Sequence, residues 1–245
     1  MTEITPESPK PSAPAMSLPA RFGGVLFAPR ATYADVAAHP RWFGILVVVL
    51  LITSSAAMAL LSTDIGRNAV IDQQIASTEA YGGHVTQTQL DAIEKIAPYF
   101  VYFAPVIQIV VLGFSCLVIS GIAFAVFSAA MGGDATFKQA FAIVAHSGVI
   151  LAVLSLFTTP LAYVRESLSS ATNLGVFLPF LDDASFLARL LGSIDLIYIW
   201  WIVSLSIGLG VLYRKRTGPI AISLLLLYVA IGVVIAAIKT ARSGV

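Results

Sequence analysis

The stretch YFVYFAPVIQIVVLGFSCLVISGIAFAVFSAAM, residues 99–131, contains no acidic or basic side chain. A helix rises about 1.5 Å per residue, so roughly 20 apolar residues cross the ~30 Å hydrocarbon core of a bilayer. This stretch is longer than one crossing requires. Pro105 and Gly113 predict a kink within it; alternatively, its first turns lie outside the bilayer.

Four further apolar segments are predicted to cross the membrane, at residues 43–61, 140–159, 194–213 and 220–238. Hydrophobic residues make up 58% of the 245 positions and charged residues only 11%, which is more apolar surface than a soluble domain of this size needs. Mean hydropathy is +0.91. A non-helical span would leave backbone polar groups without partners in lipid. The sequence therefore predicts an all-α, polytopic membrane protein with five transmembrane helices.

Outside the spans, the chain is predicted to begin with a tail. Residues 1–19 contain five prolines, two glutamates and one lysine, without an apolar core. We therefore expect a disordered, proline-rich tail over residues 1–17, no signal peptide, and a single membrane domain over residues 42–240. Cys116 is the only cysteine, so no intramolecular disulfide can form. The third span is predicted to begin at a capping box made by Thr136 and Gln139.

Residues 18–41, between the tail and the first span, have helical periodicity. Leu18, Phe22, Val25 and Leu26 recur at spacings that place them on one face of a helix. We expect this amphipathic segment to lie on the membrane surface. A linker that packs on the helix bundle is the alternative.

A second short helix is predicted within the same segment. It begins near Thr32, with Asp35 three residues later, and ends at Pro40. Interfacial aromatic and basic side chains hold such segments at the level of the lipid headgroups. Five side chains are predicted to anchor this one: Arg21, Phe22, Arg30, Arg41 and Trp42.

The basic residues indicate the orientation. With the N-terminus in the cytoplasm, eight basic residues fall on the cytoplasmic side and six outside. Arg214, Lys215 and Arg216 share the shortest connection, whereas each of the two exterior loops spreads two basic residues over more than thirty positions. Cytoplasmic loops are enriched in Lys and Arg. We therefore expect the N-terminus inside and the C-terminus outside, although Lys239 and Arg242 argue against the second point.

Three polar side chains lie within or beside the predicted spans: His146, Asp195 and Gln108. Because an unpaired ionisable group is costly at membrane depth, each is a candidate functional residue. The alternative role is structural. Such groups can fix helix register through hydrogen bonds worth about 1 kcal/mol each, and Asp195 can cap the fourth span. His146 would enter from the cytoplasmic side and Asp195 from the exterior, so the two need not meet.

Several motifs resemble bacterial members of the Yip family. They are FAPRATY at residues 27–33, HPRW at 39–42, ATFKQA at 135–140 after a Gly-Gly pair, and LGSIDL at 191–196 before a Trp-Trp pair. The resemblance extends over nearly the whole chain from about residue 20. It implies a five-helix domain with a cytoplasmic N-terminus, located here in the bacterial cytoplasmic membrane.

The same resemblance bears on function. Eukaryotic Yip proteins interact with Rab-type GTPases, which implies a role in vesicle formation and trafficking through partner proteins. Their DLYGP-type signature has no clear counterpart here, because the nearest run is DLIY at residues 195–198. Rab binding is therefore not carried over to this chain.

Other classes of function find little support. The chain has no HExxH helix, no phosphate-binding P-loop, no Cys or His cluster for a metal, and no basic stripe with interleaved aromatics for nucleic acid. Ser115 and His146 on successive spans could form an intramembrane serine protease, but such a site needs the two in contact and an oxyanion hole. We therefore predict no enzyme activity, no cofactor and no metal.

Two hypotheses of function follow. The first is a membrane-organising adaptor that contacts the bilayer and docks protein partners through its N-terminal segment. The second is a small transporter or channel that uses the polar residues of the bundle, alone or as an oligomer. Transport is disfavoured because paired broken helices and an internal repeat are missing from the sequence. The sequence leaves the oligomeric state open.

Overall fold

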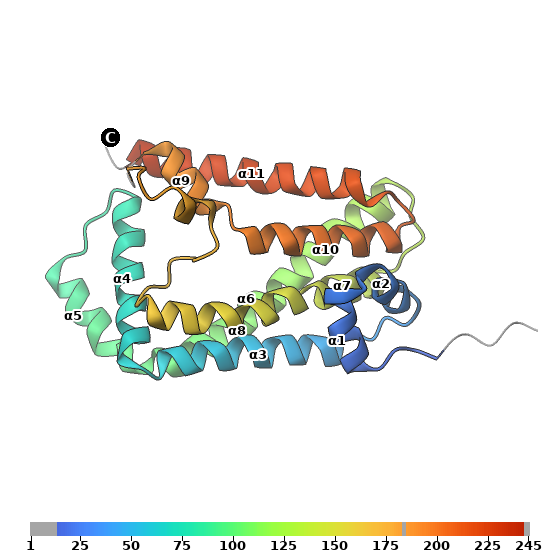
Figure 1. Cartoon of the computed structure of the whole chain (residues 1–245), viewed down its shortest axis with the longest axis horizontal. Helices are drawn as coiled ribbons and strands as arrows, with labels where there is room; N and C mark the ends of the chain where they lie inside the picture. Colours follow the sequence, from blue (N-terminus) through green and yellow to red (C-terminus); the bar gives the residue numbers. More distant parts are fainter. Residues whose placement is uncertain (1–13, 183–184, 243–245) are drawn as a thin grey trace, which may run out of the picture.

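The computed structural model describes residues 14–182 and 185–242, which form helices joined by turns and loops. Most of the predicted tail, residues 1–13, lies outside this described part. The body of the molecule consists of long helices that run along one axis, with α6 passing behind the others (Figure 1). These helices are α3 (Phe43–Leu61), α6 (Phe100–Phe124), α8 (Val149–Val164), α10 (Leu196–Leu212) and α11 (Thr217–Arg242).

Within the described residues, four helical stretches are long and apolar enough to cross a membrane, judged by length and composition. They are Phe43–Leu61, Gln87–Ala130, Phe137–Val164 and Thr217–Arg242. Helix α10 is also apolar but has only 17 residues. The protein is therefore an all-α, polytopic membrane protein, as its composition predicts. A fifth crossing by α10 stays a prediction.

Helix α3 coincides with the first predicted span, residues 43–61, whereas the other helices overlap their predicted spans but differ from them at their ends. The predicted second span corresponds to α6 followed by a π-helical turn over Ala125–Ala130, and Pro105 lies inside α6 without ending it. The predicted third span, residues 140–159, lies within a longer helical stretch, because α7 (Phe137–Ser147) continues into α8 through Gly148. The capping box at Thr136 and Gln139 is confirmed: the Thr136 N–H donates to Gln139 Oε1 at 2.8 Å.

Helix α7 lies at the centre of the packing. Every residue from 140 to 150 is buried, because α7 contacts α1, α2, α3, α6 and α10. This complete burial explains why the segment is apolar on all sides rather than on one face. Helix α7 is thus the element that the other helices pack around.

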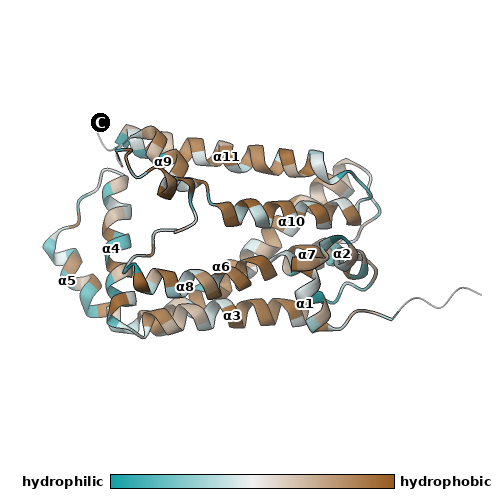
Figure 2. Ribbon diagram, in the orientation of Figure 1, coloured by the Kyte–Doolittle hydropathy of each residue, from teal (hydrophilic) through white to brown (hydrophobic). Residues whose placement is uncertain are grey.

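Helices α6 and α11 have the opposite character, since they expose large apolar side chains. Val110 is 63% exposed, Phe114 66% and Leu226 66%. Figure 2 shows the hydrophobic colouring along these long helices and the hydrophilic colouring at α4 and α5. Hydrocarbon is the medium in which such surfaces are stable, so these faces are the lipid-contacting ones.

The short helices gather at the two ends of the body (Figure 1). Helices α1 (Leu18–Phe27) and α2 (Pro29–Ala38) form a hairpin at one end, together with the α10–α11 turn. We call this the hairpin end, comprising residues 14–43, 131–138 and 213–217. Helices α4 (Asp64–Ala80), α5 (Gln87–Ile96) and α9 (Phe186–Ser193) lie at the other end. We call this the loop end, comprising residues 62–99, 165–195 and 239–242.

The hairpin packs on the bundle. This is the alternative given above for residues 18–41, in place of a segment that lies on the membrane surface. Val25, Tyr33 and Val36 are buried against other helices, and α2 contacts α7 and α10. The two helices of the hairpin approach closely at Gly24, where a Cβ would lie 2.2 Å from Thr32 Oγ1. Glycine is therefore required there by packing, although it weakens helix propensity.

The close approach at Gly24 predicts opposite effects for two adjacent substitutions. Gly24→Ala should lower the unfolding free energy by about 1–3 kcal/mol, because Thr32 is fully buried and cannot move aside. Gly23→Ala is the matched control: a Cβ there meets nothing within 4 Å, and alanine should stabilise the helix by up to about 1 kcal/mol. Thermal unfolding in detergent measures both, and equal shifts in the same direction would contradict the packing argument.

Candidate functional sites at the two ends of the bundle

A buried ion pair closes the N-terminal hairpin. Arg21 Nε donates to Asp35 Oδ2 at 2.7 Å, and Arg21 Nη2 lies 2.7 Å from the same oxygen. The Met16 N–H donates to Asp35 Oδ1 at 3.1 Å, and His39 Nδ1 lies 3.3 Å from it. The Arg21 side chain is only 3% exposed. Arg21 is thus not the surface anchor that the sequence predicts, because its guanidinium pairs with α2 instead of reaching lipid headgroups.

The surroundings of Asp35 favour its charged form. Burial acts to raise the pKa of this carboxyl, but the Met16 N–H, the Arg21 guanidinium and His39 together outweigh burial and lower the pKa. A buried carboxylate is tolerated when its hydrogen bonds and its counter-charge are both supplied. The pair therefore joins α1 to α2 in one arrangement.

The hairpin is also bonded to the bundle beneath it. The Tyr33 and Ser204 hydroxyls are 2.7 Å apart in a buried contact between α2 and α10, and burial raises the pKa of Tyr33. Gln139 Nε2 donates to the Ala37 carbonyl at 2.9 Å, which connects α7 to α2. The hairpin is therefore a fixed part of the membrane domain.

The other predicted anchors occupy varied positions. Arg30 and Arg41 are exposed. Phe22 and Trp42 are half-buried and pack against the hydrophobic core, where the Trp42 ring meets Phe141 edge-to-face at 5.0 Å. Contact of these side chains with lipid stays a prediction.

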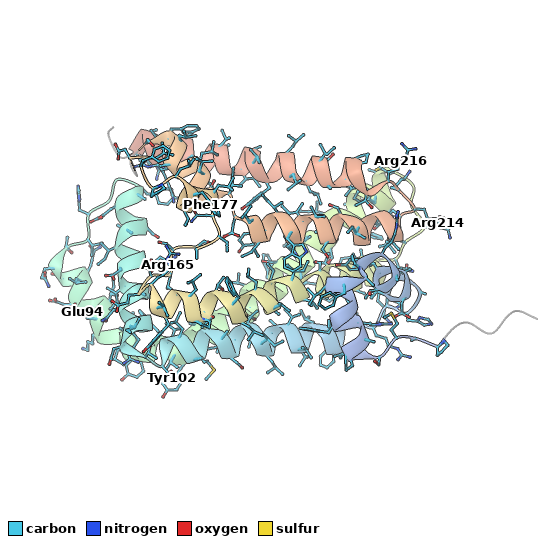
Figure 3. All side chains as sticks on the ribbon, in the orientation of Figure 1. Glu94, Tyr102, Arg165, Phe177, Arg214 and Arg216 are labelled. Atoms are coloured by element: carbon cyan, nitrogen blue, oxygen red, sulfur yellow. The ribbon has the colours of Figure 1, made fainter. Side chains whose placement is uncertain are left out.

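The two ends of the molecule differ in charge. Among the described residues, the hairpin end contains seven basic and two acidic side chains, and the loop end six basic and eight acidic. Six of the seven basic residues at the hairpin end are exposed: Arg30, Arg41, Lys138, Arg214, Lys215 and Arg216. Figure 3 labels Arg214 and Arg216 at this end, and Glu94 and Arg165 at the other. The hairpin end is therefore a positively charged surface.

Asp195, at the loop end, has its carboxylate fully occupied. Its Oδ1 accepts the Ile197 N–H at 2.8 Å, which caps α10. The Thr172 hydroxyl lies 2.9 Å from both carboxylate oxygens, and the Ser170 hydroxyl donates to Oδ2. Tyr228 on α11 accepts the Asp195 N–H at 2.9 Å. Asp195 therefore caps α10, which is the structural role given above as the alternative.

A cavity of about 370 Å³ lies between α3, α6, α8, α10 and the loop after α8. It brings together two of the three polar residues singled out in the sequence, because both Gln108 and Asp195 line it. Arg165 and Tyr198 also belong to its wall. The sequence does not indicate either residue as part of a site, because Arg165 is one of several basic residues in the loops. The cavity arises from four segments that are far apart in the chain.

His146 is separate from this cavity. Its ring is fully buried in α7, with Nδ1 2.7 Å from the Ala142 carbonyl oxygen. Its Nε2 has no hydrogen-bond partner among the described residues. Those residues also contain no hydrogen bond between His146 and Ser115 and no cluster of three His, Cys, Asp or Glu side chains that could hold a metal. The arrangement needed for an intramembrane serine protease is thus not assembled in the described part.

The ion pair of Arg21 and Asp35 was missed by sequence reasoning, although a signal for it exists. Each is an isolated charge beside residues that the structure buries, Val25 on α1 and Val36 on α2. Opposite charges beside buried positions need partners, because an uncompensated buried charge is strongly destabilising. No pattern in the sequence indicates the cavity in a comparable way.

These features define a polytopic helical membrane protein with a helical hairpin closing one end. The Yip1 domain family matches residues 23–238 of the chain. The protein therefore belongs to the Yip1 domain family, in agreement with the resemblance seen in its motifs. A search of curated proteins and a search of solved structures found no match to the chain.

Acid should weaken the hairpin through Asp35. Because the folded pKa is lowered, the stabilisation is present above the pKa of an unfolded aspartate, about 3.9, and is lost as the pH falls through the lower folded value. Asp35→Asn should remove this acid dependence and lower the melting temperature at neutral pH. Asp134→Asn, an exposed aspartate at the same end, is the control. Melting curves recorded against pH test this, and an unchanged acid profile in Asp35→Asn would contradict it.

Proposed function

We propose that this Yip1-domain protein is a non-enzymatic membrane adaptor that docks a partner protein at its hairpin end. The observation that carries the proposal is the combination of six exposed cations with a hairpin held rigidly on the bundle. A rigid, charged surface supports steering and selective binding of an oppositely charged partner. The partner of such a trafficking-type adaptor would accordingly present an acidic surface.

We further propose that the hairpin end faces the cytoplasm of a bacterial cell, with the protein in the cytoplasmic membrane. The clustering of Arg214, Lys215 and Arg216 in one short connection at this end supports that orientation, because short cytoplasmic segments of membrane proteins are enriched in Lys and Arg. Exposed apolar side chains accompany the cations: Phe27 is 88% exposed and Phe43 68%. They would bury against the partner or the adjoining lipid headgroups.

A transporter is the second candidate, supported by the one observation that Gln108 and Asp195 line the same cavity. Two observations favour the adaptor over it. The Asp195 carboxylate is occupied by hydrogen bonds within the protein. The cavity wall contains no residue of the hairpin end among those described, so it offers no continuous path between the two ends.

The orientation can be tested by cysteine labelling. Cys116 is buried, so single cysteines can be introduced at two exposed positions, Ala34→Cys on α2 and Ser77→Cys on α4. A membrane-impermeant maleimide applied to intact cells, with the outer membrane permeabilised where one exists, should label Ser77→Cys. It should label Ala34→Cys only after the cytoplasmic membrane is opened. The reverse pattern would place the hairpin outside and contradict the proposed orientation.

The docking role can be tested with surface substitutions. Deleting residues 18–40 is unsuitable, because Tyr33 and Val36 belong to the core. The double variant Arg30→Gln with Arg41→Gln removes two exposed charges without touching the core. Cross-linking pull-down from native membranes should then recover the acidic partner at least about tenfold less, since each lost charge-assisted contact costs on the order of 1 kcal/mol or more.

Lys95→Gln at the loop end is the matched control and should leave recovery unchanged. The labelling assay with Ser77→Cys confirms that both variants insert in the normal orientation. Recovery of the same partner in equal amount from all three proteins would contradict docking at the hairpin end.

A further inference from the structure

The cavity at the loop end is an elongated groove along one face of α8. The residues of α8 that line it recur at helical spacing along one face over four turns: Leu151, Leu154, Ser155, Thr158, Thr159, Ala162 and, at the helix end, Arg165. At about 1.5 Å per residue, the 14 steps from Leu151 to Arg165 correspond to roughly 21 Å. The volume, about 370 Å³, falls in the range of natural ligand sites, roughly 300–1,000 Å³.

The deep part of the groove is effectively apolar. Leucines contribute much of the groove wall: Leu60 near the loop end, and Leu112, Leu151 and Leu154 farther inside. Two of its hydroxyl groups are used within their own helices: Thr53 donates to the Val49 carbonyl at 3.0 Å and Ser155 to the Ala152 carbonyl at 2.7 Å. A polar solute would therefore find few free donors there, whereas a hydrocarbon chain would find matching walls.

Two nitrogen-bearing side chains of the wall, those of Arg165 and Gln108, remain available. The Arg165 guanidinium makes a single long hydrogen bond, 3.4 Å to the Ser169 carbonyl, within the described chain, and Arg165 is exposed at the loop end (Figure 3). Gln108 is half-buried, and its amide has no hydrogen bond to any described residue. Asp195, the acidic residue of the wall, is already saturated by Ser170, Thr172 and Ile197. The groove thus offers a cation at its mouth.

The order of these groups along the groove points to one class of ligand. Arg165 lies at the mouth, and Gln108 lies eight residues inside α6, about 12 Å from its start. Leu112 and Leu151 lie deeper still. A glycerophospholipid presents the same order: a phosphate, then ester oxygens, then an acyl chain. Guanidinium groups pair well with phosphate oxygens.

We propose that this groove binds one glycerophospholipid, with its phosphate at Arg165, an ester oxygen at Gln108 and one acyl chain along α8. The bound chain would fill the space between α8 and α10, and the phosphate would be held beside the loop that Asp195 attaches to α10. This site is independent of the docking surface at the hairpin end, so either can be wrong without the other.

Native mass spectrometry of the full chain in detergent tests the proposal, with lipid titrated against the protein. The probes are phosphatidylglycerol, diacylglycerol with the same acyl chains, and inorganic phosphate. The unmodified protein should bind one phosphatidylglycerol about tenfold more tightly than diacylglycerol, and inorganic phosphate should not displace it. Arg165→Gln should abolish that preference while binding of diacylglycerol persists. Leu154→Trp, which fills the groove, should lower binding of both lipids at least fivefold.

Matched controls separate the groove from lipid bound around the protein. Arg242→Gln changes an exposed arginine elsewhere at the loop end, and Leu117→Trp changes a half-exposed leucine on the lipid-facing side of α6. Both should bind like the unmodified protein. Equal lipid binding by Leu154→Trp and Leu117→Trp would overturn the proposal, as would an unchanged phosphate preference in Arg165→Gln. Displacement of phosphatidylglycerol by millimolar inorganic phosphate would show an anion site without a role for the acyl chain, which also contradicts it.

Discussion

The hydrocarbon core of the membrane requires each polar group within a span to find a partner inside the protein, and the bundle is organised by that requirement. Hydroxyl groups on the long helices donate to carbonyls of the preceding turn: Thr53 to Val49, Ser120 to Cys116 and Ser206 to Ile202. The helices can then pack by shape. At Gly208, a Cβ would lie 2.5 Å from Ile143 Cγ2, so α7 and α10 approach more closely than a side chain would allow.

The ends of the bundle are under a weaker constraint, and the charged residues are found there. The ion pair of Arg21 and Asp35 is buried, yet it lies in the hairpin rather than in a span, and it is supported by the Met16 N–H and His39. Its effect is to hold α1 and α2 together, while Tyr33 and Gln139 hold α2 on the bundle. The exposed cations around it are therefore carried on a rigid support.

The same constraint draws attention to polar groups that have no hydrogen-bond partner within the protein. Most hydroxyls in the spans are used locally, whereas the Gln108 amide, His146 Nε2 and Ser54 Oγ have no hydrogen-bond partner among the described residues. Gln108 faces a cavity and His146 lies in the packed core. An uncommitted group beside a cavity is available to a ligand, but one enclosed by core side chains is not. This difference separates two residues that are equally suggestive in the sequence.

Sequence reasoning predicted part of each site. Asp195 was identified with both its possible roles, because a carboxylate at a helix start has a local signature. Arg21 was identified as important but placed at the wrong surface. Its partner lies 14 residues away on another helix, and periodicity describes one helix at a time. Arg165 was treated only as a loop charge, since its role in the groove depends on how α8 packs against α3, α6 and α10.

By itself, the sequence determined that this is a helical, polytopic membrane protein, where its long helices lie along the chain, and that it resembles the Yip family. Length, hydropathy and caps suffice for that, because each is set by neighbouring residues and by the thickness of hydrocarbon. Only the tertiary structure decided that residues 18–41 fold onto the bundle and that Gln108 and Asp195 share a groove. Both outcomes depend on contacts between segments far apart in the chain, which no local pattern specifies.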